Sequence, residues 1–373
     1  MRIAIDCRSV FTGCGGIGRY ASALAGSLSE IDRKNDYLLL FTNLDGADVV
    51  TTSPRVKKAR FDCGMIDETF DQILLPVELG GEKVDLYHGT CFSIPVAKSV
   101  NRRVATVHDV VFKRHPELVD PRLAGFLDRA TEFSVLAADA VITVSEFSKR
   151  EMVELYGARP EKVHVIPNGV ERRFFKSVPE NRKEAVRRRF GLPERFVLYV
   201  GSLEEKKNTP RLLGAWSIVR KKLPEGDRVL VLVGGPGGKK YDPTADVQRL
   251  GVGSSVRLIG RVDEDDLHAL YASAECFVYP SLYEGFGLPV LEAMASGAPT
   301  VVSNSSSLPE ISGDAAVLVD PMSAEAIADG VVKLLTDEEL RTQLSKWGRA
   351  RARRFSWEDC ARATLDIYQQ LEQ

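Results

Sequence analysis

Short apolar runs alternate along the whole chain with longer segments in which apolar residues recur every three or four positions. The short runs are almost continuous in valine, isoleucine and leucine, as expected for parallel strands that helices cover on both faces. Such alternation indicates βαβ units. The pattern predicts strands in the first half at residues 2–6, 37–42, 84–89, 103–109, 140–145 and 163–168. It predicts strands in the second half at residues 195–202, 228–235, 255–261, 276–281, 299–304 and 315–320.

The two halves repeat one design and are joined by a charged, proline-containing stretch, Gly169–Pro193. We therefore expect an α/β protein with two doubly wound, Rossmann-like parallel-sheet domains, at residues 1–172 and 173–354. The segment 355–373 has the spacing of an amphipathic helix with Ser356 as its N-cap. We expect this helix to pack back on the N-terminal domain. Because open α/β sheets bind ligands at their carboxyl edges, the predicted site is a cleft between the domains.

Composition narrows the class of protein. The hydrophobic share is 44% and the charged share 27%, and the net charge of −2 gives no electrostatic basis for binding nucleic acid. The six cysteines have neither CxxC nor CxxH spacing, which disfavours a zinc site and a disulfide framework. Asp6 interrupts the only early apolar run, and no run approaches the roughly 18 residues of a membrane span. We expect a cytoplasmic protein; peripheral contact with the inner face of a membrane and the oligomeric state stay open.

A glycine-rich stretch follows the first predicted strand. Residues 13–18, GCGGIG, match the G-x-G-x-x-G pattern of dinucleotide-binding loops. In those loops the first glycine directly follows the strand, and an acidic residue ends the second strand. Here CRSVFT separates Asp6 from Gly13, and the second predicted strand is followed by Asn43. The pattern therefore disfavours a nicotinamide-dependent dehydrogenase, although a glycine-rich turn before a helix still suits a phosphate group.

The most informative stretch is YPSLYEGFGLPVLEAMASG, residues 279–297. Glu284 and Glu292 have seven residues between them. Pro289 suits the first turn of a helix, and Gly297 suits the residue just after its end. Glu284 is therefore predicted on a loop before the helix, and Glu292 on the second turn.

The start of this helix is a predicted anion site. Free N–H groups around Gly287 and Leu288 suit a diphosphate, and the helix dipole favours negative charge there. Two carboxylates beside such a site would repel the diphosphate, so we expect them to bind hydroxyl groups instead. Sugars supply hydroxyl groups, so the pattern favours a sugar diphosphate.

These residues resemble the Glu-x7-Glu motif of the retaining glycosyltransferases of family four, which have a GT-B fold. Other stretches resemble further marks of that family in the same order, and together they cover nearly the whole chain: GGIGRY, VSEFSKRE, VIPNGV, YVGSLEEKKN, GRVDEDDLHALYASAECFVYPS and LPEISGDAAVLVDP. The resemblance implies transfer of a sugar from a nucleoside-diphosphate sugar with retained anomeric configuration. It implies no required metal or other cofactor, because cations and a helix N-terminus take the place of a metal. It also implies no protein nucleophile, because the leaving phosphate helps to deprotonate the acceptor.

The resemblance assigns roles to individual residues. Glu284 is expected to contact sugar hydroxyls near the reacting carbon, and Glu292 to hold the ribose. Lys207 aligns with the lysine that binds the diphosphate, whereas Lys206 stands where arginine is common and lacks its bidentate fork. His108, beside Asp109 at the end of a predicted strand, resembles the histidine that touches the donor sugar. Further contacts to sugar, phosphate or base are expected at Gly16, Ser202, Val262, Gly285, Phe286, Gly287 and Leu288.

An acidic run, Asp263–Asp266, superficially suggests a metal site. Acidic residues in the first turn of a helix complement its dipole, and a helical pattern follows directly. The histidines also show no H-x3-H pair. We therefore expect no metal.

Donor and acceptor are less constrained. VATVHDVVFKRHPE resembles members that use GDP-mannose for surface polysaccharides, so mannosyl transfer is favoured and UDP-sugars are the alternative. The acceptor is expected to be a glycan or lipid-linked, and to bind at loops 62–79 and 90–100. A basic set is interpreted as ordinary surface charge rather than a site for an anionic lipid: Arg102, Arg103, Lys113 and Arg114. An epimerase or hydrolase of the same fold is disfavoured, because it would lack the Glu-x7-Glu loop. A non-catalytic sugar-nucleotide sensor stays open.

Overall fold

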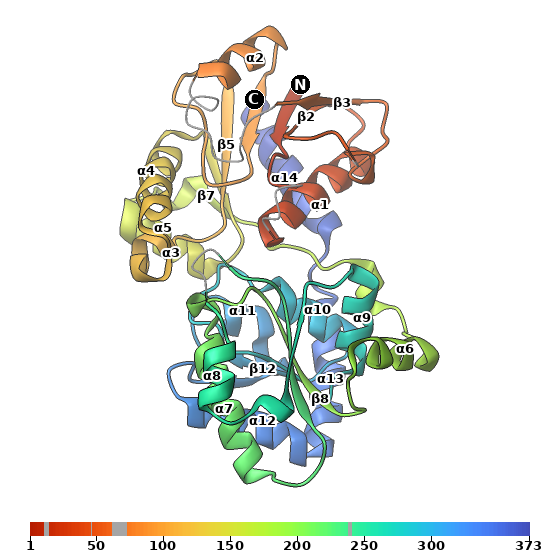
Figure 1. Ribbon diagram of the computed structural model, residues 1–373. Helices are drawn as coiled ribbons and strands as arrows, with labels where there is room; N and C mark the ends of the chain where they lie inside the picture. Colours follow the sequence, from red (N-terminus) through yellow and green to blue (C-terminus); the bar gives the residue numbers. More distant parts are fainter. Residues whose placement is uncertain (11–14, 46, 62–72, 238–240) are drawn as a thin grey trace. The chain divides into compact units, whose positions relative to one another are not determined.

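The computed structural model describes residues 1–10, 15–45, 47–61, 73–237 and 241–373. The chain divides into two compact units. Unit 1 comprises Met1–Glu117, Pro121–Gly169 and Phe355–Gln373, and unit 2 comprises Leu118–Asp120 and Val170–Arg354. The last segment of the chain therefore belongs to the same unit as the first (Figure 1).

Unit 1 is built on a seven-stranded sheet with the order β3-β2-β1-β4-β5-β6-β7, and all its neighbouring strands are parallel. The strands are β1 (Arg2–Asp6), β2 (Asp36–Phe41), β3 (Val56–Arg60), β4 (Leu86–Gly89), β5 (Arg102–Val107), β6 (Ala140–Thr143) and β7 (Val163–Val165). Every strand expected in this half is present. The hydrophobic pattern missed β3, because this edge strand reads VKKAR and is only half-buried, as is common for edges protected by lysine.

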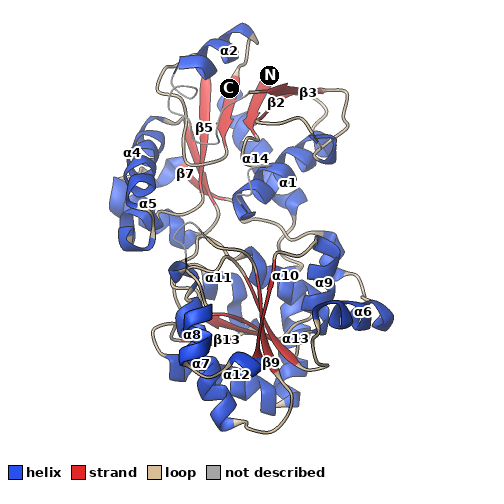
Figure 2. Ribbon diagram, viewed as in Figure 1, coloured by secondary structure: helices blue, strands red, loops and turns tan. Residues whose placement is uncertain are grey.

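The helices of unit 1 flank this sheet (Figure 2). They are α1 (Gly15–Ile31), α2 (Leu75–Gly81), α3 (Val111–Arg114), α4 (Pro121–Ala137), α5 (Glu146–Tyr156) and α14 (Trp357–Glu372). Helix α14 packs against α1. The predicted N-cap of α14 is confirmed, since the Ser356 Oγ accepts a hydrogen bond of 3.0 Å from the Asp359 N–H.

Unit 2 has a six-stranded parallel sheet with the order β10-β9-β8-β11-β12-β13. The strands are β8 (Phe196–Val200), β9 (Val229–Val233), β10 (Val256–Gly260), β11 (Cys276–Tyr279), β12 (Thr300–Ser303) and β13 (Val317–Val319). Each was predicted, although the structure ends all six earlier. The central strands are buried along almost their whole length, which explains their continuous apolar sequence.

The helices of unit 2 cover both faces of its sheet (Figure 2). They are α6 (Glu180–Phe190), α7 (Thr209–Lys222), α8 (Thr244–Arg249), α9 (Glu264–Ser273), α10 (Leu288–Ser296), α11 (Leu308–Ser312), α12 (Ala324–Thr336) and α13 (Glu338–Ala352). Helix α12 packs against α7, while α10 packs against α13 and α9. Two doubly wound parallel sheets are therefore confirmed.

Each sheet has one point at which the strand order reverses. In unit 1 the first strand, β1, lies between β2 and β4, and in unit 2 the strand β8 lies between β9 and β11. Such switch points are where open α/β sheets bind ligands.

Candidate functional site

The switch point of unit 2 brings together two loops that are far apart in the sequence. The loop after β8 contains a short 3-10 helix, η6 (Glu205–Lys207), and the loop after β11 contains Glu284. The Lys206 carbonyl accepts hydrogen bonds from the Leu282 N–H at 2.9 Å and from the Ser281 Oγ at 3.1 Å. The two loops are therefore joined at their backbones.

Asn208 fixes the lysine loop from its far end. It has a left-handed backbone with φ +63°, which asparagine adopts more readily than most residues. Its buried side chain donates to the Pro280 carbonyl at 2.9 Å and to the Pro321 carbonyl at 2.7 Å. One amide thus connects the loops that follow β8, β11 and β13.

Lys207 and Glu284 form a largely buried ion pair between these loops. The Nζ to Oε1 distance is 2.6 Å, and the side chains are only 15% and 10% exposed. The same Oε1 accepts hydrogen bonds from Ser281 at 2.6 Å and from Tyr279 at 2.9 Å. The pair is therefore held by side chains on both sides.

Burial and charge act against each other on the two pKa values. Burial opposes ionisation of Glu284, but the charges of Lys207 and Lys206 outweigh it and hold the pKa of Glu284 below its usual value. Burial likewise disfavours the charged Lys207, but Glu284 outweighs it and raises the pKa of the lysine. Both groups are therefore charged at neutral pH, and Lys206 contributes a second positive charge nearby.

A run of serines fixes the backbone of Glu284. Ser306 Oγ accepts a hydrogen bond from the Glu284 N–H at 3.0 Å, and Ser307 Oγ donates to the Glu284 carbonyl at 2.9 Å. Ser303 Oγ donates to the Ser281 carbonyl at 2.6 Å. Sequence reasoning missed these residues, because NSSSLPE reads as an ordinary polar connection. The feature that could have indicated them is a run of serine hydroxyls in a loop that follows a buried strand.

Helix α10 begins at Leu288, one residue before the predicted first residue, Pro289. Gly287 is its N-cap residue with φ +110°, a backbone conformation that favours glycine, and a Cβ there would lie 2.6 Å from the Leu308 side chain, which would have to move. Gly285, Phe286 and Leu288 are buried around this turn. The first N–H groups of a helix have no partner within it, so this end favours an anion.

Glu292 lies on the second turn of α10 and is only 2% exposed. The hydroxyl of Tyr271, from α9, donates to its Oε2 at 3.1 Å. A buried carboxylate with a fixed orientation suits the binding of a pair of hydroxyl groups.

The remaining donor-site candidates of unit 2 lie at the same strand ends. Ser202 follows β8, and its Oγ donates to Glu204 at 2.7 Å, while its carbonyl accepts from the Tyr199 hydroxyl at 2.8 Å. Val262 follows β10 and is half-buried. The structure places both near the carboxyl edge and tests neither predicted contact.

His108 directly follows β5 at the carboxyl edge of the sheet of unit 1. Its Nε2–H donates to the Thr90 carbonyl at 2.9 Å, and the rings of Tyr20 and Phe92 meet it edge-on at centroid distances of 4.9 and 5.7 Å. Burial lowers its pKa, so the imidazole is neutral at pH 7. The Asp109 Oδ1 instead accepts a hydrogen bond of 3.1 Å from the Val111 N–H, two residues on, at the turn before α3.

A buried polar network lies behind this histidine. His88 is hydrogen-bonded to the Tyr368 hydroxyl at 2.6 Å and to Thr106 Oγ1 at 2.7 Å. Thr106 in turn bonds the Tyr20 hydroxyl at 2.9 Å. The network therefore connects α14, the sheet and α1 within unit 1.

The glycine loop is only partly described. Gly13 lies outside the described residues, as does most of the first predicted acceptor loop. Gly16 is exposed on the first turn of α1. A Cβ on Gly18 would lie 2.5 Å from the Ser9 carbonyl, so this glycine lets the helix approach the chain after β1.

The basic set of unit 1 consists of paired charges. Arg114 forms ion pairs with Glu151 and Glu154 at 2.7 and 2.8 Å. Lys113 pairs with Asp128, Arg102 pairs with Asp139, and Arg103 is buried against backbone carbonyls. For Arg102, Lys113 and Arg114 this agrees with the interpretation as ordinary surface charge, whereas for Arg103 that interpretation is wrong, because its side chain is buried.

The acidic run at the start of α9 has structural partners. Asp263 is the N-cap and accepts from the Asp266 N–H at 2.7 Å, and the buried Asp266 pairs with Arg182 and Arg189. Among the described residues, no group of three His, Cys, Asp or Glu side chains is placed to hold a metal ion. Within the same part of the chain, no helix is both long and apolar enough to cross a membrane.

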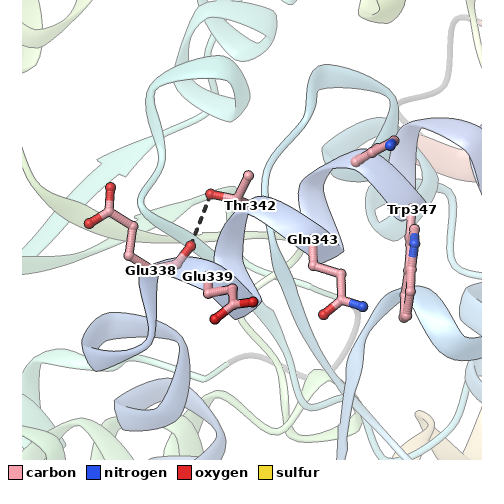
Figure 3. Close-up of a pocket in the computed structure, with 6 residues that line it drawn as sticks. Glu338, Glu339, Thr342, Gln343 and Trp347 are labelled. Atoms are coloured by element: carbon pink, nitrogen blue, oxygen red, sulfur yellow. Dashed lines mark hydrogen bonds between the residues drawn. The ribbon is translucent and has the colours of Figure 1, made fainter.

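A separate recess lies on the surface of α13 (Figure 3). Its lining comes from a single helix: Glu338, Glu339, Thr342, Gln343, Lys346 and Trp347. The Thr342 Oγ1 donates to the Glu338 carbonyl at 2.9 Å, and Trp347 is 44% exposed. None of the candidate site residues lies in it.

Solved structures show the class of fold. Sucrose-phosphate synthase from Thermosynechococcus elongatus has a TM-score of 0.78 at 23% identity, covering 100% of this chain and 99% of that chain. WaaG, a glycosyltransferase involved in lipopolysaccharide biosynthesis, has a TM-score of 0.77 at 19% identity, covering 98% and 99%. The fold is therefore GT-B.

Sequence comparison shows the family. The model of Glycosyltransferase Family 4 matches residues 14–174, and that of Glycosyl transferases group 1 matches residues 181–351. O-antigen chain mannosyltransferase B of Escherichia coli is 32% identical over 77% of this chain and 74% of that protein. The E. coli serotype-specific mannosyltransferase WbdA is 30% identical over 75% of this chain, which spans only 35% of that longer protein. The chain belongs to glycosyltransferase family 4.

Proposed function

We propose that this protein is a retaining glycosyltransferase that moves mannose from GDP-mannose to a hydroxyl of a glycan or lipid-linked acceptor. We place it in the synthesis of a surface polysaccharide or glycoconjugate. The observation that carries the proposal is the buried Lys207–Glu284 pair at the switch point of unit 2, beside the start of α10. The names of the similar E. coli mannosyltransferases support mannose as the sugar.

In this proposal, different residues of the site bind different parts of the donor. Lys207, Lys206 and the start of α10 take the diphosphate, because a leaving phosphate gains negative charge and preorganised positive groups stabilise it. Glu284 takes sugar hydroxyls, and Glu292 takes the ribose hydroxyls. Lys207 uses N–H groups on Tyr279 and Glu284 and retains one for a phosphate oxygen.

The chemistry needs no protein nucleophile. The anomeric C–O bond breaks, the nucleoside diphosphate leaves, and the acceptor hydroxyl adds on the same face while the leaving phosphate accepts its proton. The neutral His108 and the Gly16 N–H contact the donor but do not transfer a proton. Neither a metal nor another cofactor takes part in the proposed reaction, and a cytoplasmic location stays a prediction.

A thermal-shift panel with GDP, UDP, ADP and NAD tests the nucleotide class. A ligand that binds the folded state raises the melting temperature by mass action. We expect the largest shift with GDP; a larger shift with UDP favours the alternative, a UDP-sugar-dependent glycosyltransferase. A shift with NAD alone would overturn the proposal in favour of a dehydrogenase.

Turnover then tests the reaction. With GDP-mannose and a panel of mannosylated acceptors, we expect release of GDP and a product whose anomeric proton coupling shows the configuration of the donor. An inverted product contradicts the retaining mechanism alone. Tight binding of the donor without GDP release, even with acceptor present, favours a sugar-nucleotide sensor.

A further inference from the structure

Tyr279 ends β11 directly behind the Lys207–Glu284 pair, and sequence reasoning gave it no role. Its side chain is only 1% exposed. The ring stacks on Tyr199 with a centroid distance of 6.1 Å and on Phe277 with 6.0 Å. Two neighbouring rings therefore fix the direction in which its hydroxyl points.

This hydroxyl touches both members of the ion pair. It accepts a hydrogen bond of 3.1 Å from Lys207 Nζ and donates one of 2.9 Å to Glu284 Oε1. Burial, reinforced by the charge of Glu284, raises the pKa of Tyr279 well above its usual value, so the phenol keeps its proton. Ser281 also donates to Glu284, but its other contacts are backbone carbonyls rather than Lys207.

We propose that Tyr279 is a positioning residue that couples Lys207 to Glu284, so that the group for the diphosphate and the group for the sugar keep their spacing. This inference rests on the proposed function of the same site. A diphosphate competes with Glu284 for Lys207, and sugar hydroxyls compete with Lys207 for Glu284. Tyr279 binds both groups, and neither part of the donor replaces it. Loss of the Tyr279 hydroxyl therefore weakens binding of the intact sugar nucleotide more than binding of the free nucleotide.

The test compares Tyr279→Phe with wild type and with Tyr37→Phe. Phenylalanine keeps the stacked ring and removes only the hydroxyl. Tyr37 is a matched control, because it is also buried and its hydroxyl donates to a carboxylate, Asp32, at 2.7 Å within unit 1. Calorimetric titration measures the affinities for GDP, GDP-mannose, UDP and UDP-glucose, and the difference between each sugar nucleotide and its nucleotide gives the contribution of the sugar. The unfolding midpoint shows whether each variant is folded.

We expect Tyr279→Phe to weaken binding of the sugar nucleotide roughly tenfold and binding of the free nucleotide less than about threefold. Tyr37→Phe is expected to change neither the affinity for the sugar nucleotide nor the affinity for the free nucleotide. Its unfolding midpoint is expected to fall about as far as that of Tyr279→Phe. Equal losses for nucleotide and sugar nucleotide, or wild-type affinities in Tyr279→Phe, would overturn the inference while leaving the proposed function intact. A wild-type protein that binds none of the four ligands overturns the proposed function, and the inference with it.

Discussion

The two units share a parallel-sheet design, yet they hold their candidate residues by different means. In unit 2, two charged side chains, Lys207 and Glu284, lie at the centre of hydrogen bonds from neighbouring loops. In unit 1, a neutral imidazole, His108, is held by ring edges and one carbonyl. The comparison teaches that topology fixes where a site lies in such a sheet, whereas the loops decide whether that site is charged.

We expect the largest effect on transfer from variants that remove a charge from unit 2. We expect Lys207→Ala and Glu284→Ala each to lower transfer at least about 100-fold, since each removes a contact to the reacting donor. Initial rates at saturating donor measure the effect. Lys206→Ala is the matched control and is expected to lose less, because Lys206 acts on Glu284 through its charge, whereas Lys207 also donates a hydrogen bond to it. Near wild-type rates in both alanine variants would sink the site assignment.

A second prediction concerns acid and the neutral network of unit 1. Burial, followed by the nearby His108, lowers the pKa of His88 to about 3, against 6.5 in the unfolded chain. Between these values only the unfolded state binds the proton, so stability falls as pH falls, by about 1.4 kcal/mol per unit. We expect His88→Gln to lose about 2 kcal/mol less than wild type between pH 6.5 and 5. Urea unfolding at the two pH values measures this, and equal losses would contradict it.

A third prediction compares loss of the neutral His108 with loss of the charged Lys207. We expect His108→Ala to lower transfer about tenfold, less than loss of Lys207, because it removes one neutral contact. Its lowered pKa places its titration below 6.5, so the wild-type rate is expected to show no histidine limb between pH 7 and 8. A fall in rate across that interval that disappears in His108→Ala would show that the imidazole acts in its charged form.

The smallest expected effect concerns the serine run of unit 2. Ser306 has φ +55°, a conformation that glycine adopts without strain, and its Oγ binds the Glu284 N–H. We expect Ser306→Ala to lower the free energy of unfolding by about 1 kcal/mol, and Ser306→Gly to lower it less. Urea unfolding of the two variants provides the comparison. If alanine is the more stable, the backbone strain is not real.

Sequence reasoning predicted the strands well because buried parallel strands are almost entirely apolar. It placed many strand ends too late: the strand predicted at 103–109 ends at Val107, and the one at 163–168 ends at Val165. His108 and Ile166, the first residues past Val107 and Val165, stay buried or close to the strand without belonging to it, and Ser202 lies in the same way just past β8. The apolar pattern therefore cannot separate the end of a strand from the start of a site.

Within the site, sequence predicted the residues that form a contiguous motif. The loop position of Glu284 and the end of α10 before Gly297 were read correctly from one stretch, and the start of α10 was predicted one residue late, at Pro289 instead of Leu288. Tyr279 and Ser306 were not, because a tyrosine at a strand end reads as core and a serine run reads as a loop. Their importance comes from contacts made by the fold, with Lys207 and with the Glu284 backbone, which no local pattern records.

The membership of α14 in unit 1 has a consequence for biosynthesis. The chain leaves unit 1 at Gly169 and returns at Phe355, so the ribosome makes nearly all of unit 2 before it makes α14. At about 5–20 residues per second, the roughly 200 residues after Gly169 take about 10–40 s. Throughout that interval α1 lacks its packing partner, and His88 lacks the Tyr368 hydroxyl. The first unit to emerge is thus the last to be completed, which exposes it to chaperones and proteases in the growing cell.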